Sequence, residues 1–143
     1  MDKAIITEKL ESLRKCVLRL QEKAPLNVNI LLQDIDLQDI ISLNLSRAVQ
    51  LSVDIGAHLV ASLDITTPNT MGKVFDALVE AKLIEGETGL SLKKAVGFRN
   101  IAVHSYEKIN WLIVDAIIKT KLSDFQQYAH QIDAYLTNIA ANE

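Results

Sequence analysis

The sequence predicts an all-α protein, and three observations support this prediction. Apolar residues recur at the three- and four-residue spacing of a buried helix face along most of the chain. Only 5 glycines and 2 prolines occur in 143 residues, which argues against a loop-rich β fold or a disordered segment. No long stretch alternates apolar and polar residues with the period of two that a half-buried strand requires. We therefore expect an antiparallel bundle of about five helices.

The length and composition fit one helical domain spanning residues 1–143. A hydrophobic share of 49% suffices for a sizeable core. The net charge of −3 means that any contact with nucleic acid must be local rather than spread over a basic surface. Cys16 is the single cysteine, which fits a reducing compartment. Because we find neither a signal-peptide core nor a run of about 18 apolar residues, we expect a cytoplasmic protein with no membrane contact.

Two helices are expected in the first half of the chain. Apolar residues follow helical spacing from about Asp2 to Lys23, and Pro25 supplies a stop just beyond. A connection over residues 24–33 leads to a second helix that reaches Ser62. Apolar residues occupy most of the circumference of this second helix, so it is expected to lie at the centre of the bundle.

One narrow polar stripe interrupts the second helix. Its members are Asn44, Arg47, Gln50, Asp54 and His58, each one turn after the last. The stripe fits a buried hydrogen-bond seam or an internal pairing of Arg47 with Asp54. A direct contribution of Arg47, Asp54 and His58 to a functional site is the alternative, and the sequence leaves it open.

The second half of the chain continues the helical pattern. Polar residues 66–70 can cap a third helix, whose buried side is expected to contain Val74, Phe75, Leu78 and Leu83. Residues 86–89, Gly-Glu-Thr-Gly, have the composition of a turn. A fourth helix is then expected to run through Leu90, Leu92 and Val96 into residues 99–106, which are therefore expected near a helix end. From Glu107 onward the helical spacing continues to the C-terminus, with a break expected near Thr120-Lys121.

The end of the fourth helix carries the strongest candidate for a functional site, Arg99-Asn100-Ile101-Ala102-Val103-His104-Ser105-Tyr106. Arginine offers a permanent positive charge and a planar fork of donors that suits a phosphate. Histidine can exchange a proton near neutral pH. Together, Arg99 and His104 have the chemistry to cut a phosphodiester without a metal ion.

Helical geometry constrains how these side chains can meet. Arg99 and Tyr106 are seven residues apart and are expected on one face, beside the apolar residues Leu92, Ala95, Val96, Ala102 and Val103. His104 lies about 140° around the helix from Arg99 and shares a face with Asn100, which can orient the imidazole. Arg99 and His104 can therefore address one phosphate only if the helix distorts near Ser105 or if two copies build the site. We favour two copies.

This octapeptide resembles the R-x4-H-x-Y signature of HEPN-domain ribonucleases, with the best fit to the HepT toxins of MNT/HepT toxin–antitoxin pairs. The flanking residues 96–98 and 106–109 resemble that family's flanks, and residues 44–59 resemble its earlier long helix. The resemblance covers most of the chain. It implies a HEPN-type helical bundle that forms a dimer, with both copies of the motif lining one cleft.

The resemblance also implies an activity, that of a metal-independent endoribonuclease. In that family's mechanism His104 acts as general base or acid around the ribose 2′-hydroxyl. Arg99 binds the scissile phosphate, and cleavage leaves a 2′,3′-cyclic phosphate. Asn100 and Tyr106 support the catalytic pair, and no cofactor is required.

The same resemblance implies a regulator, an MNT-type nucleotidyltransferase antitoxin that adenylylates the motif tyrosine. By this reasoning Tyr106 becomes O-AMP-tyrosine, and the chain is the toxin of a type VII-like pair that forms a homodimer or a larger hetero-oligomer with its antitoxin. The alternative is a non-catalytic interaction module. In that case Arg99 and His104 only organise a helical dimer that binds a nucleotidyltransferase partner.

Other chemistry finds little support in the sequence. His58, His104 and His130 have no second histidine and no cysteine three or four residues away. The acidic cluster of Asp34, Asp36 and Asp39 lacks the glycine and the terminal glutamate of a calcium loop. Cys16 has no nearby histidine or second cysteine and is expected to be a small core residue. We therefore expect no metal site.

Overall fold

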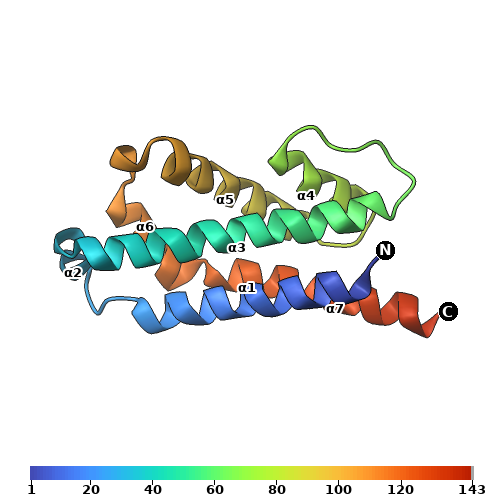
Figure 1. Ribbon diagram of the computed structural model, residues 1–143, viewed down its shortest axis with the longest axis horizontal. Coiled ribbons are helices and arrows are strands. Elements are labelled where there is room, and N and C mark those ends of the chain that lie inside the picture. Colours follow the sequence, from blue (N-terminus) through green and yellow to red (C-terminus); the bar gives the residue numbers. More distant parts are fainter. Residues whose placement is uncertain (143) are drawn as a thin grey trace.

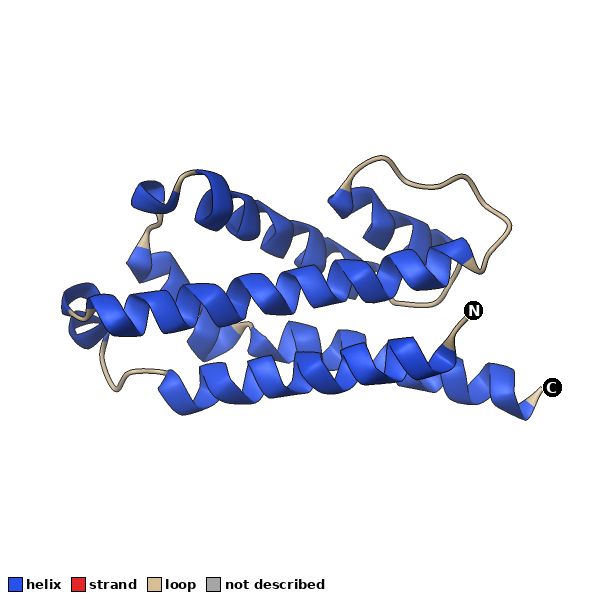
Figure 2. Ribbon diagram, in the orientation of Figure 1, coloured by secondary structure: helices blue, strands red, loops and turns tan. Residues whose placement is uncertain are grey.

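The computed structural model describes residues 1–142, and every regular element in that range is helical (Figure 2). The α-helices are α1 (Lys3–Lys23), α2 (Val28–Gln33), α3 (Ile35–Ala61), α4 (Met71–Glu80), α5 (Gly86–His104), α6 (Trp111–Thr120) and α7 (Leu122–Ala141), with one 3-10 turn, η1 (Tyr106–Lys108). The predicted all-α class is confirmed. None of these helices combines the length and the apolar character that a membrane span needs.

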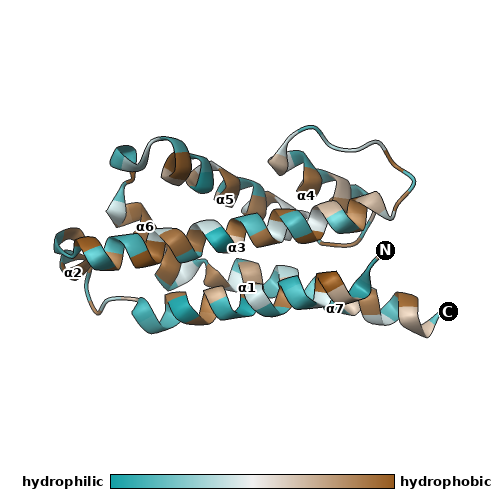
Figure 3. Cartoon of the chain, viewed as in Figure 1, coloured by the Kyte–Doolittle hydropathy of each residue, from teal (hydrophilic) through white to brown (hydrophobic). Residues whose placement is uncertain are grey.

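Helix α3 lies at the centre of the bundle, as the sequence predicted (Figure 1). It packs against α1 on one side and against α4 and α5 on another, with further contacts to α2 and α7. Its residues Ile55 and Leu59 are fully buried. The predicted face of α1 is also confirmed, because the following residues are all buried: Ile6, Leu10, Leu13, Val17 and Leu20. Brown apolar and teal polar residues accordingly alternate along α1 in Figure 3.

The structure contains two more helices than the sequence made evident. Helix α2 occupies part of the predicted connection 24–33, because the Asn27 side chain accepts a hydrogen bond from the Asn29 N–H (3.0 Å) and caps a short turn of helix. Asp34 then caps α3 by accepting from the Leu37 N–H (3.0 Å). The last helical stretch is divided at Lys121, which ends α6 and precedes α7, and this confirms the predicted break.

The prediction of a turn at residues 86–89 is wrong, because α5 begins at Gly86. Tertiary contacts fix this first turn of the helix. The side chain of Gln131 on α7 accepts a hydrogen bond from the Glu85 N–H (2.8 Å) and donates one to the Thr88 hydroxyl (2.9 Å). A partner 43 residues away thus overrides the local preference of a Gly-Glu-Thr-Gly segment.

We predict opposite effects for alanine at two helical glycines. A Cβ on Gly56 would lie 2.5 Å from Val74 Cγ1 and 3.2 Å from the Tyr128 hydroxyl, whereas a Cβ on Gly97 would meet no atom within 4 Å. Overpacking should therefore make Gly56→Ala less stable by about 1–2 kcal/mol despite its better helix propensity. The free energy of unfolding of Gly97→Ala should rise by up to about 1 kcal/mol. Urea unfolding of both variants measures this difference. A change of stability in the same direction for both variants would contradict the prediction.

Candidate active site

The predicted motif lies at the C-terminal end of α5, and His104 is the last residue of that helix. Ser105 leaves helical geometry with φ −149° and ψ 53°. The Lys108 N–H then donates to the Ser105 carbonyl (2.8 Å), which folds Tyr106 into the 3-10 turn η1. The expectation that Arg99 and Tyr106 share a helix face is therefore wrong, because the helix ends before Tyr106.

Tyr106 is held instead by a residue from the other half of the chain. Its hydroxyl donates a hydrogen bond of 2.6 Å to Oδ1 of Asp39 on α3. The Trp111 ring meets the Tyr106 ring edge-on, with the two centroids 5.9 Å apart. Tyr106 nevertheless remains 40% exposed, so its hydroxyl group lies within reach of a partner molecule.

The environment of Tyr106 favours the protonated phenol. Burial is the largest cause, and the hydrogen bond to Asp39 and the negative charge of Asp39 act in the same direction. Together they raise the pKa of Tyr106 to about 12. At neutral pH the side chain is therefore a hydrogen-bond donor and not a phenolate.

Arg99 is half-buried, and its charge has no carboxylate partner among residues 1–142. Its Nη1 instead donates to the thioether sulfur of Met71 at the start of α4, at 3.9 Å. Thioether sulfur is a weak acceptor. A partly desolvated guanidinium whose side-chain hydrogen bond within residues 1–142 goes to this weak acceptor is suited to bind an anion.

His104 is exposed, and no side-chain hydrogen bond found in residues 1–142 involves it. Its ring nitrogens are therefore available to a substrate. Asn100 is also exposed and makes no hydrogen bond with His104. The predicted orientation of the imidazole by Asn100 is thus not formed within this single chain.

The separation of Arg99 and His104 follows from the helix that carries them. Both lie within α5, which is helical from Gly86 to His104. Five residues of helix place their Cα atoms about 140° apart around the axis and about 7.5 Å apart along it. The departure from helical geometry at Ser105 comes after both residues and does not bring them together.

Exposed apolar side chains surround this end of α5. We call them the motif-end patch, and they are Ile101 and Val103 of α5 together with Leu112 and Ile113 at the start of α6, a few residues further along the chain. The exposed fraction is 53% for Val103, 56% for Leu112 and 57% for Ile113. The expectation that Val103 belongs to a covered face beside Arg99 is therefore wrong within one chain. Apolar side chains exposed together are typical of an interaction surface.

The polar stripe of α3 is not a buried seam. The Gln50 amide donates to Oδ1 of Asp54 (2.9 Å), and Lys9 of α1 forms an ion pair with Asp54 at 3.9 Å. The predicted pairing of Arg47 with Asp54 is therefore wrong. Arg47 is exposed and lines an open groove between α1 and α3, together with Lys15 and Arg19.

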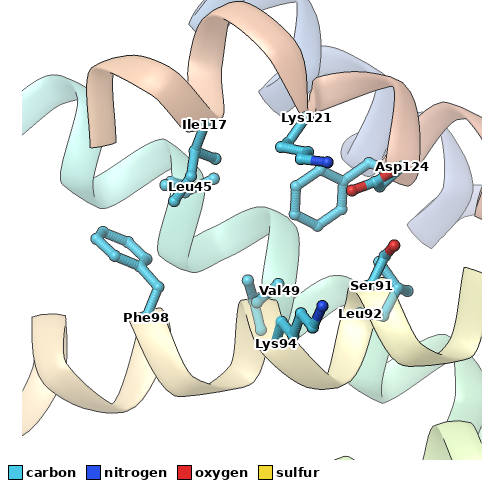
Figure 4. Close-up of a pocket in the computed structure, with 11 residues that line it drawn as sticks. Leu45, Val49, Ser91, Leu92, Lys94, Phe98, Ile117, Lys121 and Asp124 are labelled. Carbon is cyan, nitrogen blue, oxygen red and sulfur yellow. The ribbon is translucent and has the colours of Figure 1, made fainter. Parts of the chain in front are cut away.

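A pocket of about 220 Å³ lies between α3, α5, α6 and α7 (Figure 4). Apolar side chains such as Leu45, Val49 and Phe98 form most of its wall, with Lys94, Lys121 and Asp124 also lining it. None of the predicted site residues Arg99, Asn100, His104 and Tyr106 lines it, and its volume is below the usual range of about 300–1,000 Å³ for small-molecule sites. The candidate active site is thus an exposed surface and not this pocket. Within the described residues, no cluster of three metal-ligating side chains occurs.

Asp39 is the site residue that the sequence did not reveal. The sequence placed it in an acidic cluster that fits no calcium loop, and nothing in its spacing connects it with a tyrosine 67 residues later. The one feature of the sequence that could have drawn attention to Asp39 is its charge in the first turns of the central helix. Only the packing of α3 beside α5 and η1 brings this carboxylate to the motif.

Comparison with known proteins shows which family this chain resembles. The family described as ribonuclease HepT-like matches residues 6–132. The chain is 34% identical to the mRNA nuclease HepT of Shewanella oneidensis over 130 residues, covering 91% of this chain and 97% of that protein. It is 24% identical to the tRNA nuclease HepT of Aphanizomenon flos-aquae over 139 residues, covering 97% and 95%.

The fold is also similar to that of a solved structure of a HEPN toxin. The tri-AMPylated HEPN toxin of Shewanella oneidensis, in complex with an MNT antitoxin, superposes with a TM-score of 0.86 at 34% identity. The superposition covers 94% of this chain and 99% of that chain. The similarity to HEPN toxins that the motif predicted is confirmed.

We predict that Asp39→Asn lowers the pKa of Tyr106. The substitution removes the negative charge beside the phenol but leaves its burial, so the pKa should fall below 12 and remain above the ordinary value of 10. An ultraviolet absorbance titration, taken as the difference from Tyr106→Phe, isolates this phenol from the other tyrosines. Circular dichroism recorded in parallel checks that the fold persists. An unchanged midpoint would contradict the contact with Asp39.

Proposed function

Because this chain belongs to the ribonuclease HepT-like family, we propose that it cuts RNA with Arg99 and His104 as its catalytic pair. Membership in the family makes the chain a HEPN ribonuclease of the toxin–antitoxin type. The proposal concerns which residues perform the reaction and how they are controlled. The observation that carries it is the half-buried guanidinium of Arg99, which lies on the motif helix without a carboxylate partner in the described residues.

The chemistry requires a base, an acid and a positive charge. A base removes the proton of the ribose 2′-hydroxyl, the 2′-oxygen attacks the adjacent phosphorus, and the bond to the 5′-oxygen breaks. The products are a 2′,3′-cyclic phosphate and a 5′-hydroxyl, which takes up a proton. His104 exchanges these protons, and Arg99 balances the charge that develops on the phosphate oxygens. This sequence of steps uses no metal ion or cofactor.

The two catalytic residues belong to different copies of the chain in this proposal. Helical geometry separates Arg99 from His104 within one α5, as described above. The motif-end patch offers an apolar surface on which a second copy can pack. A two-fold axis through this surface would place Arg99 of each copy beside His104 of the other. The chain is thus proposed to act as a homodimer with a shared cleft.

The proposed substrate is RNA, bound locally at this cleft. Two similar proteins are named for cleavage of mRNA and of tRNA respectively, so the class of RNA differs among relatives. The net charge of −3 agrees with recognition confined to a small surface rather than a broad basic face. Cleavage in the cytoplasm, where both RNA and a reduced Cys16 are expected, completes the proposal.

We predict that Arg99→Ala and His104→Ala each lower RNA cleavage by about 10²–10⁴-fold, because each removes one component of the reaction. Both residues are exposed or half-buried, so the variants should keep native helical content and melting behaviour. The assay is cleavage of total RNA by purified protein, with and without EDTA. Full activity of His104→Ala, or loss of native activity in EDTA, would contradict the mechanism and favour a non-catalytic interaction module.

The same two variants also test the shared cleft. A mixed dimer of Arg99→Ala with His104→Ala keeps one of its two pairs of Arg99 and His104 intact, with the arginine from one copy and the histidine from the other. Random mixing should therefore restore about a quarter of native activity. If each chain instead builds its own site, the mixture stays inactive, because every chain lacks one catalytic residue.

Control of the nuclease is proposed to act through Tyr106. A similar HEPN toxin is tri-AMPylated and bound to an MNT antitoxin, and Tyr106 presents a 40% exposed phenol close to His104 in the sequence. An AMP group on this phenol adds bulk and negative charge beside the cleft. Both oppose entry of an RNA phosphate that Arg99 must bind. The partner in this proposal is a nucleotidyltransferase antitoxin.

We predict that Tyr106→Phe escapes this control, because it keeps the ring and lacks the oxygen that accepts the nucleotide. After co-expression with the antitoxin, intact-mass analysis should show AMP-sized additions on the native chain and none on Tyr106→Phe. The native chain should lose its toxicity to growing cells, while the variant keeps whatever cleavage it has. Neutralisation of the native chain without any change of mass would instead mean inhibition by binding alone.

A further inference from the structure

We propose that Asp39 is the proton acceptor for transfer of AMP to Tyr106. This inference rests on the proposed modification of Tyr106 and adds a residue of this chain to the transfer reaction. The observation behind it is the contact between Asp39 Oδ1 and the Tyr106 hydroxyl at 2.6 Å. Asp39 would thus be catalytic for the chain's own modification and would have no assigned part in RNA cleavage.

The geometry suits a proton transfer. A general base must lie within about 2.6–3.2 Å of the atom whose proton it removes, and Asp39 meets this condition without any rearrangement. It is the one side chain in residues 1–142 that hydrogen-bonds to this hydroxyl. Asp39 is exposed, so water can carry the proton away after the reaction.

The reaction needs such an acceptor because the phenol is a poor nucleophile. The pKa of Tyr106 is about 12, so only about one phenol in 10⁵ is ionised at neutral pH. Asp39 is also the charged group that acts on this pKa. The same carboxylate that opposes formation of a free phenolate is therefore placed to take the proton as the new bond forms.

The step balances as a nucleotidyl transfer from ATP. The Tyr106 oxygen forms a bond to the α-phosphorus, and the bond from that phosphorus to the oxygen bridging to the β-phosphorus breaks. Pyrophosphate leaves with the bonding electron pair, and the phenol proton moves to the Asp39 carboxylate. The antitoxin supplies and positions ATP, and this chain supplies the nucleophile and the base.

The test compares Asp39→Asn with Asp36→Asn. The first variant keeps an oxygen that can accept a hydrogen bond but cannot hold the proton. The second removes an equal charge from the first turn of α3, at a carboxylate that makes no hydrogen bond with Tyr106. The rate constant of first AMP addition is measured by intact mass, with saturating antitoxin and ATP, over a range of pH. Affinity for the antitoxin is measured separately for each chain.

We expect Asp39→Asn to slow AMP addition by about 10²–10⁴-fold at neutral pH, with unchanged affinity for the antitoxin, and Asp36→Asn to match the native rate. The ratio of the native rate constant to that of Asp39→Asn should fall about tenfold per pH unit, because a growing fraction of Tyr106 is already ionised and needs no base. Taking the ratio of the two chains cancels the antitoxin's own response to pH.

Three results would contradict the role of Asp39 and leave the proposed modification of Tyr106 unaffected. They are a rate for Asp39→Asn within a few-fold of native, a deficit that does not change with pH, and a deficit explained by weaker binding of the antitoxin. The first two would leave Asp39 as a tether for Tyr106 only. Absence of AMP on the native chain is a different result, because it would remove the proposed modification itself.

Discussion

Burial of α3 is the constraint on which the rest of the structure depends. A helix that is apolar around most of its circumference can be stable only when neighbours cover it from several sides, and α1, α4, α5 and α7 all pack against it. Buried Tyr128 of α7 completes the packing by donating a hydrogen bond to the Ser52 carbonyl (2.8 Å). The position of α5 and of the motif at its end follows from this packing.

Burial sets Arg99 apart from the other arginines among residues 1–142, because Arg14, Arg19 and Arg47 are all exposed. Arg14 is paired with Asp133, Lys93 with Asp76 (3.0 Å) and Lys119 with Asp115 (2.9 Å). The pairs of Arg14 and Lys93 are exposed and contribute about 0–1 kcal/mol each, whereas Asp115 in the third pair is buried. Arg99 is half-buried, and the side-chain hydrogen bond that it makes within residues 1–142 goes to the sulfur of Met71. A thioether sulfur is a weak acceptor and offsets little of the desolvation of the guanidinium.

The sequence predicted the fold class and the central helix because both depend on local periodicity. It could not predict that Tyr106 leaves the face of Arg99, because this depends on the backbone conformation of a single residue, Ser105. It also could not predict the start of α5 or the partner of Tyr106. Gln131 and Asp39 decide those features, and both are distant in sequence and close only after folding.

The contact of Tyr106 with Asp39 has a mechanical consequence. It is the side-chain bond that ties the segment after α5 to the central helix across 67 residues of chain. Any group attached to the Tyr106 oxygen removes the donor, and a phosphate there would meet the Asp39 carboxylate as a like charge. Modification would therefore break the contact between Tyr106 and α3. The free and modified proteins would differ in the surroundings of Asp39, and not only in the group that Tyr106 carries.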